Sequence, residues 1–236
     1  MADTRLTGSD KRVLLLWIAC GLFGAFFAAR YYFRAFPEAS VDFKISRSAA
    51  RQRAKQFVEG LGENIAGYQS TIVFEVDEDA KTYLERELGL QQANRLMAGP
   101  LNIWYWEVRF FRPQQEEEFK VRVSPSGNVV GYEHRIEEAR AAKSLEREQA
   151  LSAAEGFLKT KMGYDLAEWR FLPEESNSTA RARRTDWSFT WERKGFRASQ
   201  APYRLVVGLA GDRIGSSQEF LQLPEAWIRD YKHLRS

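Results

Sequence analysis

The longest uninterrupted apolar stretch of the chain lies close to its N-terminus. Residues 13–29 read VLLLWIACGLFGAFFAA, seventeen positions without a charged side chain. As a helix this stretch spans about 25 Å, near the lower limit for crossing the hydrocarbon core of a bilayer. Basic residues close both ends, and aromatic residues follow at 31–33, where interfacial aromatics are common in membrane proteins. The pattern predicts a transmembrane helix over residues 13–35, preceded by a cytoplasmic tail of residues 1–12.

A secretory signal peptide, removed after export, is the alternative interpretation of this stretch. No small-x-small cleavage pattern follows the apolar run, because phenylalanines precede Ala28 and Ala29 at the corresponding positions. We therefore expect an uncleaved, single-pass anchor. Basic residues flank both of its ends, so the positive-inside rule leaves the orientation nearly balanced. Short N-terminal tails usually stay cytoplasmic, which predicts that the bulk of the chain lies outside the cytoplasm.

Small residues recur every four positions along this predicted helix and form two rows. The rows are Cys20, Gly24 and Ala28, and Gly21, Ala25 and Ala29. Such rows allow two helices to approach closely in lipid, although small residues are also simply common in membrane helices. The candidate positions for membrane-helix packing are Gly21, Gly24, Ala25 and Ala28.

An internal repeat organises the rest of the sequence. Five apolar positions recur in order: Ile45, Ala50, Ala54, Phe57 and Val58 match Leu145, Ala150, Ala154, Phe157 and Leu158. Both sets keep helical spacing, so each predicted helix packs one face against another layer. Gly62 and Gly163 end the two helices, and Ser144 is the predicted N-cap of the second.

A second block repeats further along the chain, and its part from Phe119 onward keeps a constant offset without a gap. Trp104 to Glu107 answers Phe189 to Glu192, and then Phe119, Val121, Val123, Gly127, Val130 and Gly131 match Tyr203, Leu205, Val207, Gly211, Ile214 and Gly215. The alternation of Phe119, Val121 and Val123 with basic residues predicts a strand with one solvated face. Each repeated unit is therefore expected to be one helix packed on an antiparallel sheet of three or four strands.

The predicted fold class is α+β, with the transmembrane helix followed by two such units that pack together. The expected order is a first unit over residues 40–137 with a helical insert near 77–99, a second unit over 143–223 with a polar loop over 173–184, and a polar C-terminal tail over 224–236. The charged, alanine-rich link over residues 137–143 is expected to extend helically into the second helix.

These units resemble PepSY domains, the cystatin-like module of secreted protease propeptides and bacterial envelope proteins. The resemblance is carried by the helix EQALSAAEGFL (148–158) and the hairpin FKVRVSPSGNVVGYEH (119–134). A second resemblance covers nearly the whole chain. One hydrophobic segment, two such units and the closing LPEAWIRDYKHLRS (223–236) are similar to the N-terminal region of some bacterial CPBP intramembrane metalloproteases. It implies a piece or relative of such a bacterial membrane enzyme but no proteolysis by this chain, since that family's glutamate pair and membrane-embedded histidines have no counterpart here.

Composition and charge exclude several classes of function. The net charge of +3 is small, and the one basic cluster, Arg181, Arg183 and Arg184, has no interleaved aromatic residues, so we expect no nucleic-acid partner. The lone Cys20 allows neither an internal disulfide nor a cysteine-rich metal site.

No catalytic, cofactor or metal-binding residue is predicted. His134 follows Glu133 on a predicted strand, where neighbouring side chains point to opposite faces, and both His134 and His233 are expected to be ordinary surface histidines. The run Glu116 to Glu118 is expected to be an exposed, solvated loop. A Ser/His/Asp arrangement is not excluded by the sequence.

The repeated aromatic residues carry two interpretations. Packing of a sheet face under a helix is the first, because paired aromatics typically dominate such cores. An exposed groove or sheet edge that accepts an extended peptide is the second. The candidate contact residues for a peptide or partner protein are Trp104, Tyr105, Trp106 and Trp191.

The sequence favours a non-catalytic binding or regulatory module, held on the outer side of a bacterial cell membrane, that contacts a protein, a peptide or an adjacent membrane domain. The alternative is the accessory N-terminal portion of a CPBP-type metalloprotease whose catalytic helices lie outside this chain. A third is a soluble hydrolase released by signal cleavage near residue 30.

Overall fold

The computed structural model describes residues 8–35 and 41–235. Residues 1–7, which make up most of the predicted cytoplasmic tail, lie outside the described part, and so do Ser236 and residues 36–40, the last of which is the predicted start of the first repeated unit. The chain divides into two compact parts, an N-terminal part (Met1–Val41) and a second part (Asp42–Ser236) that holds the sheet and that we call the soluble unit.

The N-terminal part contains helix α1 (Gly8–Ala35), which begins more than a turn before the apolar stretch. Its apolar side chains, such as Leu15 and Phe23, are exposed rather than packed against protein. Within the described residues α1 is the one helix long and apolar enough to cross a bilayer, with a mean hydropathy of 2.0 over an 18-residue window. A signal sequence has the same properties, so the helix establishes a candidate membrane span.

The soluble unit is a mixed fold of helices and one antiparallel sheet. Its strands are β1 (Gln69–Val76), β2 (Trp104–Phe111), β3 (Glu118–Val123), β4 (Val129–Arg135), β5 (Trp169–Ala180), β6 (Thr185–Ala198), β7 (Ala201–Ala210) and β8 (Arg213–Leu221). Its helical segments are α2 (Arg47–Gly60), α3 (Glu78–Leu88), α4 (Leu90–Met97), α5 (Arg147–Phe157), the π-helical turn η2 (Leu158–Met162), the 3-10 turn η3 (Leu166–Glu168) and α6 (Glu225–Arg235).

All eight strands belong to a single sheet, in the order β1-β2-β3-β4-β8-β7-β6-β5. Strands β1 to β4 follow one another as neighbours, and so do β5 to β8, so the N-terminal half (α2 to β4) and the C-terminal half (α5 to β8) each contribute four consecutive strands. The two halves meet where β4 pairs with β8 through Gly131–Gln218, Tyr132–Ser217 and Glu133–Ser216. We call this three-pair junction the seam.

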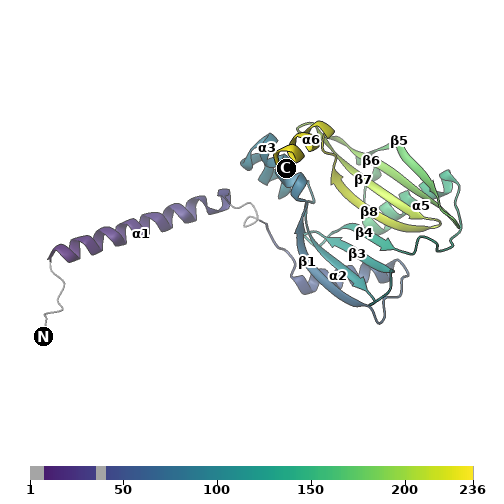
Figure 1. Ribbon diagram of the computed structural model, residues 1–236, viewed down its shortest axis with the longest axis horizontal. Coiled ribbons are helices and arrows are strands. Elements are labelled where there is room, and N and C mark those ends of the chain that lie inside the picture. The colour runs from purple at the N-terminus through teal and green to yellow at the C-terminus, as the bar shows by residue number, and fades with distance from the viewer. Residues whose placement is uncertain (1–7, 36–40, 236) are drawn as a thin grey trace. The chain divides into compact units, whose positions relative to one another are not determined.

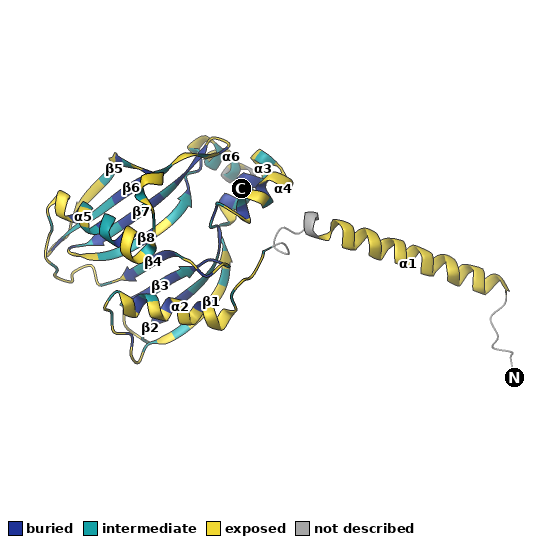
Figure 2. Ribbon diagram, turned by 180° about the vertical axis from the view of Figure 1, so that it is seen from behind, coloured by how far each residue is buried: buried dark blue, intermediate teal, exposed yellow. Residues whose placement is uncertain are grey.

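Helices α2 and α5 cover the same face of the sheet, as the two opposite views in Figures 1 and 2 show. Helix α2 lies on β2, β3 and β4, and α5 lies on β6 and β7. Small buried residues let both helices approach the strands closely: Ala50 and Ala54 in α2, and Ala150 and Ala154 in α5. Alternate strand residues such as Val121 fill the space beneath them, which places the core between one helical layer and one sheet face.

Three local predictions differ from the structure. The expected polar loop over residues 173–184 is largely strand, because β5 extends to Ala180 and pairs with β6. An edge strand with polar residues on both sides lacks the apolar alternation that marks a strand in sequence. The link over residues 137–143 is not helical, and the N-cap of α5 is Glu146, in a capping box with Gln149, rather than Ser144.

The expected polar tail at the C-terminus forms helix α6. Trp227 of α6 meets Tyr83 of α3 edge-on, with ring centroids 5.2 Å apart, and Arg86 lies 5.0 Å from the ring centroid of Tyr231. The Tyr83 hydroxyl accepts a hydrogen bond from the backbone N–H of Gln200 in the β6–β7 turn. The predicted helical insert, which holds α3 and α4, is therefore anchored to the end of the C-terminal half.

Candidate functional site

A cavity of about 640 Å³ lies between α2 and the residues that follow α5, above the seam. The β3–β4 turn closes one side of it, and Glu219 of β8 and Asn102, just before β2, contribute from below. The lining residues are Arg53, Gln56, Phe57, Asn102, Gly127, Asn128, Val129, Val130, Lys161, Met162, Gly163, Tyr164 and Glu219. Both halves of the soluble unit therefore contribute to this site.

Two basic residues on opposite walls of the cavity have no acidic partner among the residues that the structure describes. Arg53 of α2 donates to the carbonyl oxygen of Gly127 at 3.3 Å, and Lys161 of η2 donates to that of Gly60 at 2.8 Å. Within the described part of the chain, no carboxylate lies in ion-pair distance of either cation. Their charges are therefore available to an acidic group that enters the cavity.

The carboxylate of Glu219 sits at the base of the cavity and accepts several hydrogen bonds. The hydroxyls of Tyr164 and Tyr203 each donate to one of its oxygens, and the side-chain amide of Asn102 donates at 2.9 Å. The backbone N–H of Asn102 also donates to the Tyr203 hydroxyl at 3.2 Å. Because Asn102 belongs to the N-terminal half, this cluster joins the two halves beneath the cavity.

Both tyrosines of this cluster remain neutral donors. Burial, followed by the nearby charge of Glu219, raises the pKa of Tyr164 and of Tyr203 well above the ordinary value of a phenol. A phenol held neutral in this way is a poor base or nucleophile at physiological pH. The cluster is suited to fixing the shape of the cavity floor.

Aromatic rings join the two helices beside the cavity. The ring of Phe57 in α2 lies edge-on to Phe157 of α5, with centroids 6.4 Å apart, and to Tyr132 of β4 at 5.6 Å. Tyr132 also contacts Phe157, with centroids 6.4 Å apart. Such pairs are worth about 0.5–1.5 kcal/mol each beyond burial, so the helices on either side of the cavity hold a defined separation.

A second polar cluster surrounds His134 at the other end of the seam. The expected surface histidine is buried instead: its side chain is 2 % exposed and stacks on Phe119 with ring centroids 4.1 Å apart. Its Nε2 lies 2.9 Å from Glu117, and its Nδ1 lies 3.9 Å from Glu63. Alternation with Val130 and Tyr132 places His134 on the apolar face of β4, and that pattern could have predicted its burial.

The glutamate run before β3 is not a solvated loop throughout. Glu118 is buried on the strand and pairs with Arg109 and Arg135. Burial would raise the pKa of Glu117, but hydrogen bonds from His134 and Arg140 outweigh that effect and hold its pKa below the ordinary value. Both carboxylates therefore stabilise the fold.

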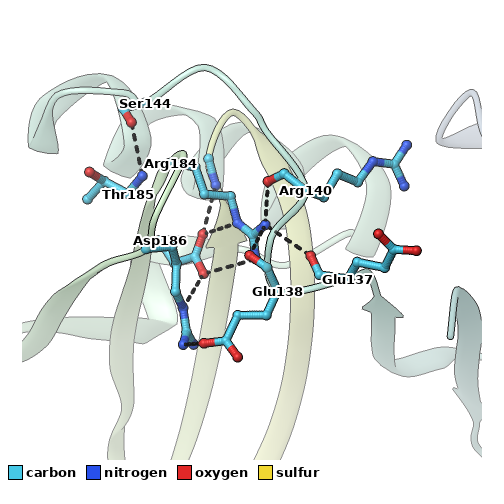
Figure 3. A network of polar contacts seen from close by, with 9 residues as sticks. Glu137, Glu138, Arg140, Ser144, Arg184, Thr185 and Asp186 are labelled. Carbon is cyan, nitrogen blue, oxygen red and sulfur yellow. Dashed lines mark hydrogen bonds and ion pairs between the residues drawn. The ribbon is translucent and has the colours of Figure 1, made fainter.

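Arg184 ties the link between the halves to the C-terminal half, as Figure 3 shows. Its Nη1 lies 3.2, 3.0 and 2.7 Å from the carbonyl oxygens of Glu137, Glu138 and Arg140, and its Nε donates to Asp186 at 2.8 Å. A smaller cavity of about 260 Å³ lies between this link, His134 and the start of β8. Figure 3 also shows that Ser144, the predicted N-cap, accepts a hydrogen bond from the backbone N–H of Thr185 instead of capping α5.

The four aromatic residues predicted to contact a peptide do not form one site. Trp104 and Trp106 lie on the helix-covered face of β2, Tyr105 points to the opposite face, and Trp191 lies on β6, with four strands between β2 and β6. Trp104 and Trp191 are buried, whereas Tyr105 and Trp106 are half-buried. Burial favours the packing interpretation for Trp104 and Trp191.

Trp106 belongs to an aromatic cluster near the β1 edge of the sheet. Its ring lies 5.0 Å from Phe74 and 5.7 Å from the exposed Phe43, measured between centroids. Its indole N–H is buried and has no hydrogen-bond partner among the described residues. Tyr105, on the other face, lies under the guanidinium of Arg122, 4.7 Å from the ring centroid.

The predicted membrane-packing residues all lie in α1. Gly21 and Gly24 have open space where a Cβ would stand, and Ala25 and Ala28 are exposed with them. Their role in helix packing stays a prediction.

The described residues contain no group of three or more histidine, cysteine, aspartate or glutamate side chains placed to hold a metal ion. Sequence reasoning missed Arg53, Lys161 and Glu219, because the cavity is assembled from segments far apart in the chain. No protein-family model, curated protein or solved structure matches the sequence. The resemblance to PepSY units and to CPBP proteins therefore stays a prediction.

Proposed function

We propose that the chain is a membrane-anchored, non-catalytic binding module that holds a segment of a partner protein in the cavity between α2 and η2. The observation that carries this proposal is the cavity itself, with two unpaired cations on its walls. Helix α1 supplies the anchor. The tether confines the module near the bilayer and raises its effective concentration toward membrane-bound partners.

The size and lining of the cavity fit a short polypeptide segment. A volume of about 640 Å³ falls in the usual range for ligand sites, roughly 300–1,000 Å³. Apolar residues such as Phe57, Val130 and Met162 can cover side chains of the segment, and amides such as Gln56 and Asn128 can pair with its backbone. Arg53 and Lys161 favour a segment with an acidic side chain or a free C-terminal carboxylate.

We also propose that the two halves are repeated, PepSY-like units related by a two-fold axis through the seam. The residues from Phe119 to Gly131 differ from their matches in the C-terminal half by 84 positions. Applied to the seam, this offset turns the pair Tyr132–Ser217 into Ser216–Glu133, which is itself the next pair of the ladder. Each half also runs in the same order, with one covering helix and then four strands, which supports common units.

The proposed location is the outer side of a bacterial cell membrane. In this orientation Lys11 and Arg12, directly before the apolar stretch of α1, face the cytoplasm, where basic flanking residues are favoured. Single cysteines placed at exposed sites of the soluble unit, in a Cys20→Ser background, test this. Labelling of intact cells by a membrane-impermeant maleimide is expected, and labelling only after lysis would reverse the orientation.

The binding proposal is tested with the full chain in lipid nanodiscs and a library of short peptides, each made with a free and an amidated C-terminus. We expect binding of peptides with acidic groups or free carboxylates. R53Q/K161Q should weaken binding by roughly 100-fold or more, since each charged hydrogen bond contributes about 1.5–3 kcal/mol. The matched control R147Q/K159Q removes two exposed charges outside the cavity and should bind normally. Equal binding by both double variants, or a library without ligands, would reject the proposal.

A further inference from the structure

Helix α2 carries a row of exposed basic residues on the flank that faces away from the cavity. Arg47, Arg51 and Lys55 follow one another at four-residue spacing, and Lys44 precedes them. We define these four residues as the basic row. Residues 41–60 contain five basic residues and only two acidic ones, Asp42 and Glu59.

The charges of the basic row are poorly compensated within the protein. Among the described residues, the side chains of Lys44 and Arg51 make no ion pair or hydrogen bond. Lys55 lies 3.8 Å from Glu59, but both side chains are at least half exposed, so water screens this pair. Arg47 donates to the carbonyl oxygen of Ile72 at 2.7 Å, which leaves its positive charge unpaired.

The fold does not require α2 to be basic. Helix α5 covers the same face of the same sheet and carries two acidic residues, Glu148 and Glu155, against one basic residue, Arg147. Protection of the β1 edge explains Arg47, which caps an edge carbonyl, but among the described residues Arg51 makes no hydrogen bond to that strand. The remaining charge therefore calls for a partner outside the chain.

We propose that the basic row docks on anionic lipid headgroups of the membrane that holds α1. This inference rests on the proposed membrane anchor and is independent of the cavity ligand. Only eleven residues, 36–46, separate the end of α1 from the start of α2, and such a segment reaches at most about 40 Å. The basic helix is thus the element of the soluble unit that follows the anchor most closely in the chain.

Anionic headgroups supply the negative charge that the basic row lacks within the protein. A negatively charged bilayer surface attracts basic side chains within about a Debye length, roughly 8 Å at physiological salt. The attraction favours docking by a factor of about five for each lysine or arginine near the surface. Lys44, Arg51 and Lys55, the three members of the row that do not cap the β1 edge, therefore shift the ratio of docked to undocked modules by on the order of 100-fold.

The test uses the full chain in nanodiscs, with a donor dye on Gln52→Cys in a Cys20→Ser background and an acceptor on the lipid headgroups. Gln52 is exposed beside the basic row. Energy transfer should be higher in discs that contain equal parts of phosphatidylcholine and phosphatidylglycerol than in phosphatidylcholine alone, and raised salt should remove the difference. K44Q/R51Q/K55Q should abolish the difference as well.

A matched control removes three exposed charges elsewhere, in R147Q/K159Q/R183Q, and should keep full transfer. Equal transfer in the two kinds of disc, or equal loss in both triple variants, would overturn the inference. A triple variant that loses binding to nucleic acid while keeping its lipid response would overturn it in favour of a different partner. Failure of the chain to enter discs at all would instead contradict the proposed anchor.

Discussion

Replacing Arg184 with alanine is expected to destabilise the soluble unit more than any other single charge removal in the link region. The side chain is 5 % exposed, lies against three backbone carbonyls of the link and pairs with Asp186. Its loss leaves those carbonyls with one fewer donor in a site that water reaches poorly. Breaking a buried pair costs about 3–5 kcal/mol, and because Asp186 keeps Arg181 and the N–H of Gly211, we expect about 3 kcal/mol.

Urea unfolding of the full chain in mild detergent, followed by tryptophan fluorescence, measures this loss. In thermal unfolding the same change lowers the midpoint by about 6–12 °C for a unit of this size. Arg183→Ala is the matched control, since this neighbour is exposed, and we expect it to change stability by less than about 0.5 kcal/mol. Arg184→Lys keeps the charge but not the planar fork, and it should lie between the two. A loss below about 1 kcal/mol in Arg184→Ala would mean that water already satisfies the link carbonyls.

Three further predictions test separate parts of the structure. Trp106→Phe removes a buried indole N–H that has no partner among the described residues, so urea unfolding should show a change of less than about 1 kcal/mol, and a large loss would reveal a hidden acceptor. Glu117→Gln should cost stability at neutral pH. Because the folded pKa lies below its ordinary value of 4.5, the deficit should shrink as the pH falls below that value, and a deficit that grows in acid would contradict the assignment. Gly211→Ala places a methyl group 2.6 Å from Ala142 at a φ of +65°, whereas Gly163→Ala meets open space at a φ of +75°. The first should therefore lower the melting midpoint further than the second, and equal shifts would show that only backbone strain matters.

The sequence predicted the helices and strands that pack one face against the core and expose the other face to solvent. Phe119 to Val123 alternates apolar and charged residues, because one side of β3 meets α2 and the other meets solvent, and the structure places a strand there. The helices were predicted for the same reason, from buried positions such as Ala54 and Ala154. Periodicity reports burial, so it works wherever burial is one-sided.

Periodicity was uninformative where burial depends on distant partners. The second part of β5 is polar on both sides, so its pairing with β6 left no mark in the sequence. The cavity has no sequence signature either, because Arg53, Lys161 and Glu219 come from three separate elements. Only the joining of β4 to β8 brings these elements together. Neither propensity nor spacing specifies which strand ends become neighbours.

The seam has a consequence for any attempt to divide the protein. Expressing the two halves separately would leave β4 and β8 without their mutual backbone partners and create two new open sheet edges. Each fragment would then be a four-stranded sheet with a newly unpaired edge strand, and two copies of one fragment would pair through these edges. Truncated versions should therefore assemble or precipitate instead of behaving as free-standing domains, and an expression trial that ends at residue 137 would reveal this at once.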